Sequence, residues 1–291
     1  MYGGVCGIGF AGGFRQFLKV VVENVAFFCY AIKLERGCIF LMKYSLRRNS
    51  MGQVLHKYTT LESLALILKS KKIRLNSLTA MDDLQEAETD DEIEYGKYVF
   101  ISSWMDQPLE SIAMWKLYSN MSSGVRIGLQ RYPFKKYTIT KQDMERVFPN
   151  VEVNGTQADL IVPIEECFND SYFILNFLYE KSLEKVEYTD DPKRLSPKVF
   201  TIGNEEIKLA SAKLGKYKNT YWEFQNEERY VLRFLPVDVK QMLGPAVNAA
   251  DIVYKSFINT KDFLPYYDLK ISDEAYCSME ITLSPQFSDG N

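Results

Sequence analysis

The sequence predicts an α+β fold that is built as a single domain. From Val54 onward, short segments rich in β-branched and aromatic residues alternate with segments whose apolar residues recur at helical spacing. No internal repeat, low-complexity linker or break in composition divides the chain. Hydrophobic residues make up 46% and charged residues 25% of the 291 residues, which is an ordinary balance for a chain that buries one sizeable core.

The first 50 residues form an atypical N-terminal extension, for which a start upstream of the functional chain is one explanation. Lys19 and Glu23 interrupt their apolar runs, so we expect neither a membrane span nor a secretory leader. The segment Gly7–Gly12 matches the GxGxxG pattern, but it lacks the preceding strand that a dinucleotide site requires. The sequence therefore predicts one domain over residues 51–291.

The expected elements follow one another closely along the chain. Thr60 is a typical N-cap residue, and the Leu-rich segment behind it predicts an amphipathic helix. The pair Asn154-Gly155 predicts a hairpin turn, and residues 82–94 predict an acidic loop or a short helix. The expected strands are 54–59, 73–76, 98–104, 124–129, 230–235 and 278–283, and the expected helices are 61–68, 111–118, 173–183 and 205–215.

Charge and cysteine content exclude several classes of function. The net charge is −3 and no basic block is present, which argues against a protein that holds duplex nucleic acid by phosphate neutralisation alone. His56 is the one histidine, so His-rich metal sites are excluded. The five cysteines lack metal-ligand spacing, and residues 82–94 lack the spacing of a calcium loop. We therefore expect no metal, and a reducing, cytoplasmic location.

The segment from Tyr221 to Leu232 places three glutamates, a glutamine and an arginine at the entrance of an apolar, strand-like segment. Burying charges costs free energy of desolvation unless they are paired or functional. Side chains of an extended chain alternate between faces, so Gln225, Glu227 and Arg229 are expected on one face. Two interpretations stay open, namely a working carboxylate site and an exposed turn with a salt-bridged strand start.

Further polar and aromatic groups stand near the ends of expected elements. The run His56–Tyr58 lies near the end of the first strand, where polar side chains can meet a ligand at the edge of a sheet. Ser103 follows an apolar run, and its small hydroxyl lets a ligand ring approach and supplies a hydrogen bond. Trp115 and Tyr118 share one helix face, for which core packing is the competing interpretation.

Taken together, these segments resemble a bacterial domain-of-unknown-function family. The likeness covers about residues 54–235 and depends on the order and spacing of its motifs. In this chain they are Lys57-Tyr58, Ile73–Ser77, Asp82–Glu86, Ser102-Ser103, Met114–Tyr118, Gly124 and Trp222–Arg229. The chain departs from the pattern at three places, where Asp82 replaces the usual Asn, Leu84 the usual Pro and Gln225 the first Glu of E-x-E.

The run Leu55–Thr59, followed by a Leu-rich helix and a polar strand, also resembles the start of toxin-type ADP-ribosyltransferases that modify DNA. A basic residue, strand hydroxyls and a Glu of the Q/E-x-E type then follow in the order that this superfamily uses. The resemblance implies an ADP-ribosyltransferase-like fold, with a split, mixed β-sheet that is flanked by helices and clamps NAD.

The same resemblance implies roles for particular residues. Glu227 is the expected carboxylate beside the ribosyl cation, and Gln225 is the group expected to orient the acceptor. The other expected NAD-binding residues hold a phosphate or ribose, support the carboxylate or stack on nicotinamide. They are His56, Lys57, Tyr58, Ser103, Trp115, Tyr118 and Arg229.

The first functional hypothesis is an NAD-consuming ADP-ribosyltransferase or NAD glycohydrolase of toxin or phage-defence type, whose acceptor (nucleic acid, protein or water) is left open. The second is a non-catalytic nucleotide- or partner-binding module of the same fold. A metal-dependent nuclease that uses residues 82–94 is weaker, because a second ligand motif is missing. Convergence of Lys57, Ser103 and Glu227 in one cleft favours the enzyme, whereas a Glu227 paired away from any opening favours the module.

Overall fold

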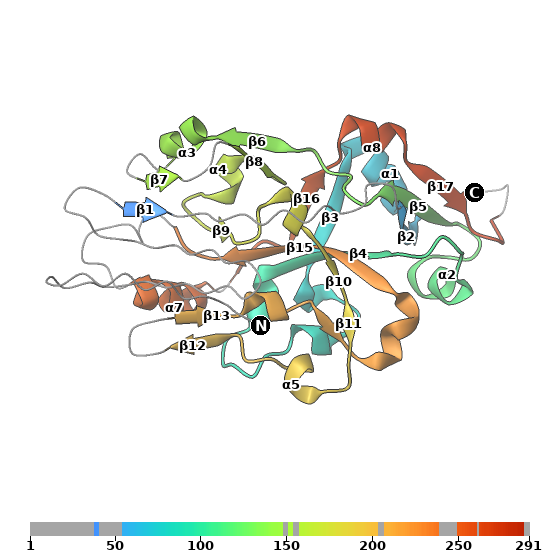
Figure 1. Cartoon of the computed structure of the whole chain (residues 1–291). Coiled ribbons are helices and arrows are strands. Elements are labelled where there is room, and N and C mark those ends of the chain that lie inside the picture. The colour runs from blue at the N-terminus through green and yellow to red at the C-terminus, as the bar shows by residue number, and fades with distance from the viewer. Residues whose placement is uncertain are drawn as a thin grey trace, which may run out of the picture.

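A long central strand, β15 (Glu227–Leu235), runs through the middle of the molecule (Figure 1). The computed structural model describes residues 38–40, 54–147, 151–153, 157–202, 207–238, 249–260 and 262–287. The Gly7–Gly12 segment and the expected turn at Asn154-Gly155 lie outside these residues. Every residue of β15 is buried, including the charged side chains, so both faces of this strand are covered.

The large sheet has nine strands, in the order β10-β15-β4-β2-β5-β17, and β3, β9 and β16 attach beside this path. The bounds are β2 (Val54–Thr60), β3 (Lys72–Ser77), β4 (Val99–Met105), β5 (Gly124–Gln130), β9 (Phe173–Ile174), β10 (Leu183–Lys185), β16 (Tyr266–Lys270) and β17 (Glu280–Leu283). The six strands expected from the sequence are confirmed with small shifts at their ends, whereas β9, β10 and β16 were not among them.

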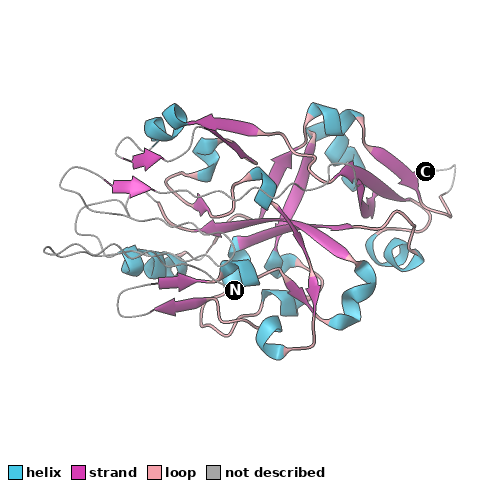
Figure 2. Ribbon diagram, viewed as in Figure 1, coloured by secondary structure: helices cyan, strands magenta, loops and turns pink. Residues whose placement is uncertain are grey.

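The helices within the described residues are short and surround the strands (Figure 2). They are α1 (Leu61–Ser70), α2 (Ile112–Tyr118), α3 (Lys141–Val147), α4 (Ile164–Cys167), α5 (Pro192–Leu195), α7 (Ala249–Asn259) and α8 (Asp273–Cys277). Thr60 caps α1 as expected, since its side chain accepts a hydrogen bond from the backbone of Ser63 at 3.2 Å. None of the helices that the structure describes has the length and apolar character that crossing a bilayer requires.

The expected mixed sheet is wrong, because the described pairings of the large sheet are all antiparallel. Helix α2 joins β4 to β5, and such a crossover returns the chain parallel to its starting strand. However, β2 lies between β4 and β5 and is antiparallel to both. The two parallel strands therefore never become neighbours, and the fold is α+β with a large antiparallel sheet.

The sheet forks along one edge of β4. At the end of β4, Met105 pairs with His56 of β2, whereas nearer its start Ile101 pairs with Asn76 of β3. Between these two contacts, Ser102 to Trp104 have β15 as their one strand neighbour among the described residues. Strands β2 and β3 are joined by α1 and leave β4 at different points, so the sheet is split even though it is not mixed.

Four small two-stranded sheets lie outside the large one. They are β1 (Cys38–Phe40) with β7 (Val151–Val153), β6 (Tyr137–Thr140) with β8 (Gln157–Leu160), β11 (Glu187–Tyr188) with β14 (Tyr217–Lys218), and β12 (Phe200–Ile202) with β13 (Ile207–Leu209). The helices expected at 173–183 and 205–215 are wrong, since the described parts of these segments form short strands and 3₁₀ turns.

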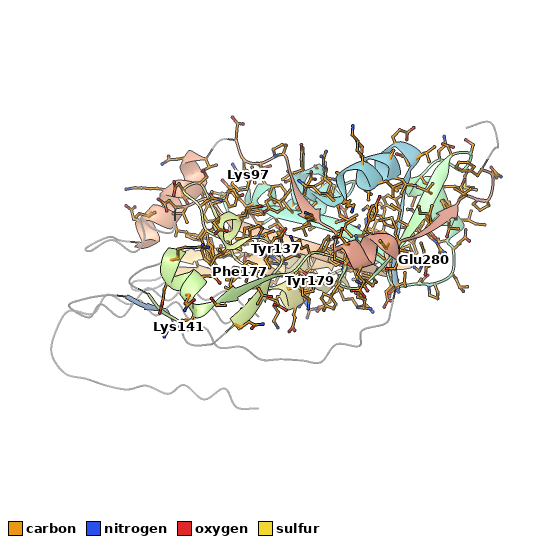
Figure 3. The ribbon with its side chains drawn as sticks, turned by 90° about the horizontal axis from the view of Figure 1, so that it is seen from above. Lys97, Tyr137, Lys141, Phe177, Tyr179 and Glu280 are labelled. Carbon is orange, nitrogen blue, oxygen red and sulfur yellow. The ribbon has the colours of Figure 1, made fainter. Side chains whose placement is uncertain are left out.

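One hydrophobic core joins residues from Leu55 to Ala275, which supports a single domain over the described part of the chain. Phe177 and Tyr179 lie in the dense inner part of Figure 3, with Lys141 and Glu280 toward opposite ends. A second, smaller cluster packs α2 against β2 and the end of β4. It consists of Tyr58, Met105, Met114 and Trp115.

A chain that begins at Met51 is expected to fold cooperatively. The strand β1 is the one described element before that point, and it pairs with β7 in a two-stranded sheet apart from the large one. Its loss therefore leaves the pairings of the nine-stranded sheet intact. Circular dichroism and a thermal melt of both chains check this, and an insoluble or non-cooperative short chain beside a folded full chain would refute it.

Candidate functional site

A cavity of about 500 Å³ lies in the fork between β2, β3 and β4. Helix α1 also lines it, as do the segment 80–86, one face of α2 and the start of β15. Its volume falls in the range that small-molecule and cofactor sites occupy. The fork creates this space, because a sheet with paired strands throughout would have filled it with neighbouring backbone.

The residues expected from the sequence meet in this cavity, with one exception. Those that line it are His56, Lys57, Tyr58, Ser103, Tyr118, Gln225, Glu227 and Arg229. Trp115 is fully buried beside them, where it packs edge-on against the ring of Tyr58 with centroids 4.8 Å apart. Its indole nitrogen donates to Glu110 at 3.0 Å, so Trp115 acts in the core rather than as a wall of the cavity.

The entrance to β15 has a sharper turn than an extended chain would give. Residues Thr220–Gln225 form a 3₁₀ helix, and Asn226 adopts a left-handed conformation with φ of 41° before Glu227 begins the strand. Asparagine tolerates this conformation better than most residues. Glu227 and Arg229 share a strand face as expected, but Gln225 lies before the strand and does not. The turn at Asn226 nevertheless brings the side chains of Gln225 and Glu227 to the same cavity.

Glu227 belongs to a buried quartet of charges, formed by Glu86, Lys218, Glu227 and Arg229. The guanidinium of Arg229 donates to both carboxylate oxygens of Glu227, from Nε at 2.5 Å and from Nη2 at 3.0 Å. The Lys218 amine lies 3.3 Å from Glu227 and 3.0 Å from Glu86, which also contacts Arg229. Two anions and two cations thus balance in a part of the core where each side chain is at most 7% exposed.

The quartet keeps Glu227 ionised. Burial raises the pKa of this carboxyl, but the positive charges of Arg229 and Lys218 outweigh burial and hold the pKa at about 2. A hydrogen bond from the side chain of Ser103 acts in the same direction. At neutral pH this group is a fixed negative charge that faces the cavity, suited to stabilising a cation rather than to moving a proton.

Gln225 links the quartet to the aromatic side of the cavity. Its Oε1 accepts a hydrogen bond from Lys218 at 2.9 Å, and its Nε2 donates to the Tyr118 hydroxyl at 2.6 Å. Burial raises the pKa of Tyr118 to about 12, with Asp82 and Glu227 adding to the effect. The hydroxyl is therefore protonated at neutral pH and can donate to a ligand.

Lys57 lies at the fork itself. Its Nζ donates to the backbone carbonyl of Ser103 at 3.1 Å, which lies in the stretch of β4 that lacks a strand neighbour on this edge. Burial lowers the pKa of this amine to about 8, although the negative charge of Glu227 opposes the shift. Lys57 is therefore mostly charged at neutral pH, but its uncharged form is far more populated than in an exposed lysine.

Replacing Lys57 by methionine is expected to stabilise the protein at pH 7, by on the order of 1 kcal/mol. The folded state binds fewer protons than the unfolded state between about pH 8 and the ordinary lysine pKa of about 10.4. Stability therefore rises across that window, and below it the folded state carries the full cost of the buried charge. Melts at pH 7 and pH 10 check this, because the gain from Lys57→Met has to shrink at the higher pH.

Glu228 faces away from the cavity. Its carboxylate contacts Arg131, which also lies 3.5 Å from Asp106. Burial raises the pKa of Glu228, and the ion pair with Arg131 opposes this. The adjacent glutamates of β15 thus serve opposite faces of one strand, and both are buried.

Sequence reasoning missed two members of the quartet. The sequence places Glu86 in an acidic loop or short helix and gives no sign that it is buried, yet it is 6% exposed and packs into the core from a 3₁₀ turn. Its signal was available, because it ends the Asp82–Glu86 motif. Lys218 stands in the two-residue strand β14, and no pattern in the sequence distinguishes it from a surface lysine.

Comparison of the chain with family models, with curated proteins and with solved structures found no match in any of the three. Among the described residues, no group of three His, Cys, Asp or Glu side chains gathers as a set of metal ligands. The interpretation of the site therefore depends on the geometry of the cavity and on the order of the motifs.

Proposed function

We propose that the protein cleaves NAD between nicotinamide and ribose and passes ADP-ribose to an acceptor or to water. The observation that carries the proposal is the convergence of Lys57, Ser103 and Glu227 on one cavity of about 500 Å³. In this proposal, the forked antiparallel sheet is the clamp of an ADP-ribosyltransferase-like fold, and the cavity in the fork receives NAD.

The reaction suits a carboxylate that stays charged. Breaking the nicotinamide-ribose bond develops positive charge on the ribose, as in glycoside cleavage. A preorganised anion beside that carbon lowers the barrier without having to reorient during the step. Glu227 meets this requirement, since its pKa of about 2 leaves it ionised and Arg229 fixes its position.

The neighbouring groups have complementary roles in the proposal. Tyr118 and Gln225 lie together in the cavity and offer a hydroxyl and an amide to the acceptor or to the nicotinamide carboxamide. Lys57 and His56 lie on β2, where a phosphate or ribose of NAD would approach. Ser103 steadies Glu227 through its side-chain hydrogen bond.

A second candidate function is a non-catalytic module that binds a nucleotide or a partner in the same cavity. The observation that favours it is the bidentate pairing of Glu227 with Arg229, which satisfies both carboxylate oxygens. In the enzyme this pairing only orients the carboxylate, whereas in the module it makes the carboxylate a structural group.

Incubation with NAD labelled in both the nicotinamide and the adenine ring separates the two candidates. The enzyme releases nicotinamide, and the adenine label then appears on protein, RNA or single-stranded DNA, or as free ADP-ribose when water is the acceptor. Gln225→Ala is expected to reduce transfer more than hydrolysis, because Gln225 orients the acceptor. Binding of NAD without nicotinamide release under any of these conditions supports the module and refutes the enzyme.

The proposed biological role is that of a toxin or phage-defence effector that acts in the cytoplasm. An enzyme that consumes NAD depletes a cofactor on which the whole cell depends. Expression in bacteria is therefore expected to slow growth in proportion to the loss of NAD, and Glu227→Gln is expected to restore both. Growth inhibition that persists in this variant would count against the role.

A further inference from the structure

Lys57 has an unusual set of neighbours for a lysine inside a protein. Within the described residues its amine lies within ion-pair distance of no carboxylate. Its described contacts are the backbone carbonyl of Ser103 at 3.1 Å and, more loosely, the ring of Trp104 at 5.9 Å. The side chain is partly buried in the cavity wall, and lysines that lose contact with water usually have a charged partner, so this placement needs a reason.

The reason lies in the burial of the amine beside carboxylates that already have partners. Glu86 and Glu227 are the carboxylates of the buried quartet, and Lys218 and Arg229 already neutralise both of them. Lys57 therefore has no carboxylate of its own among the described residues, and burial lowers its pKa although the charge of Glu227 opposes the shift, so the uncharged amine is far more populated than in an ordinary lysine. A carbonyl acceptor such as that of Ser103 accepts a hydrogen bond from a neutral amine as well. The nitrogen lone pair then remains available to a ligand in the cavity.

We propose that Lys57 is a carbonyl-trapping site, at which Nζ condenses with the aldehyde of a small ligand to form an imine. The Nζ lone pair attacks the carbonyl carbon, a proton passes from nitrogen to the carbonyl oxygen, and a carbinolamine forms. Loss of that oxygen as water, with the second amine proton, gives the carbon-nitrogen double bond. The step needs no oxidant or reductant and is reversed by water.

The cavity supplies the surroundings that this chemistry requires. Lysines with partly desolvated amines are the ones that form Schiff bases in proteins, because the amine is nucleophilic without first losing a proton. Burial lowers the pKa of Lys57 to about 8, so the free base, although the minor form at neutral pH, is far more populated than in an exposed lysine. The protonated Tyr118 hydroxyl lines the same cavity and offers a proton to the departing oxygen.

The ligand class is a small aldehyde, including the open-chain form of a reducing pentose. The pentose assignment rests on the proposed function, because NAD cleavage in water frees the anomeric carbon of ADP-ribose and lets that ring open. A trapped product would then limit turnover. The amine chemistry of Lys57 does not depend on this and applies equally to a non-catalytic cavity.

Reductive trapping tests the site directly. The full chain is incubated at pH 7.5 with glyoxylate and sodium cyanoborohydride, which reduces the imine to a stable secondary amine, and labelled peptides are quantified by mass spectrometry. Lys57 is expected to label at least about 10-fold faster than the exposed Lys69 of α1. Lys57→Arg is expected to lose this fast phase, and the matched surface variant Lys69→Arg to keep it.

The assay does not depend on the folding of a variant, since the rates are compared within one wild-type chain. Labelling of Lys57 no faster than labelling of exposed lysines overturns the proposal. A parallel reaction with ribose 5-phosphate tests the pentose, and fast glyoxylate labelling without pentose labelling limits the site to smaller aldehydes and overturns the pentose assignment. Nicotinamide release, measured without reductant, reports separately on NAD cleavage, so the two proposals can fail independently.

Discussion

Replacing Glu227 by glutamine is expected to reduce nicotinamide release by about 100-fold or more. The substitution keeps the shape and one hydrogen-bonding oxygen, but it removes the charge that faces the developing ribosyl cation. Because Arg229 and Lys218 then lose part of their compensation, the melting temperature should also fall. Initial rates have to be measured well below that temperature, with circular dichroism confirming that the variant is folded.

The adjacent residue supplies a matched control. Glu228→Gln makes the same chemical change on the same strand, but its side chain contacts Arg131 on the opposite face. It is expected to keep nicotinamide release within a few-fold while it also lowers the melting temperature, because Glu228 is buried in its own ion pair. If both variants lose activity equally, or both keep it, Glu227 has no special role in cleavage.

The largest effect on stability is expected from Arg229→Met, at about 3–5 kcal/mol. Arg229 contacts both carboxylates of the quartet and also donates to the backbone carbonyl of Gly215 at 3.1 Å. Methionine fills much of the same volume, but it leaves Glu86 and Glu227 with Lys218 as their remaining partner in the quartet. Urea unfolding followed by tryptophan fluorescence measures the change.

Arg74→Met is the control for that experiment. Arg74 also pairs with a carboxylate, Asp268 at 3.1 Å, but its side chain is 49% exposed, so the loss should stay below about 1 kcal/mol. The double variant Arg229→Met with Glu86→Gln is expected to lose less unfolding free energy than the two single variants lose together, since it removes one buried carboxylate that would lack a partner. Additive losses would show that the quartet does not act as a unit.

The sequence predicts six strands of the large sheet correctly, but it does not predict the path of the chain beside β15. Residues 173–183 have helical spacing of apolar residues, yet they follow the edge of β15 in the structure. Asn176 explains this, because its side-chain amide donates to the carbonyl of Val231 and its oxygen accepts from the backbone of Arg233, both at 2.7 Å. A side chain that substitutes for strand backbone is a tertiary effect, and no local pattern reports it.

The candidate site could be predicted wherever polar residues interrupt apolar segments. Lys57, Ser103 and Glu227 were found in that way, and they meet in the cavity. A sequence motif marks Glu86, but only the folded chain shows that Glu86 and Lys218 are buried against each other from distant segments. In the sequence, a charged residue that is buried against a distant segment looks the same as a charged residue on the solvent-exposed surface.

The forked edge of β4 has a consequence for how a ligand is recognised. Strands of one sheet form much of the cavity wall, and α1, α2 and the segment 80–86 complete it within a single domain. A ligand therefore meets hydrogen-bond donors and acceptors that are already in place, and binding costs the protein little conformational entropy. Selectivity then depends on how well the shape of the ligand matches the cavity. Discrimination between related nucleotides depends on single side chains, which can be substituted without disturbing the sheet.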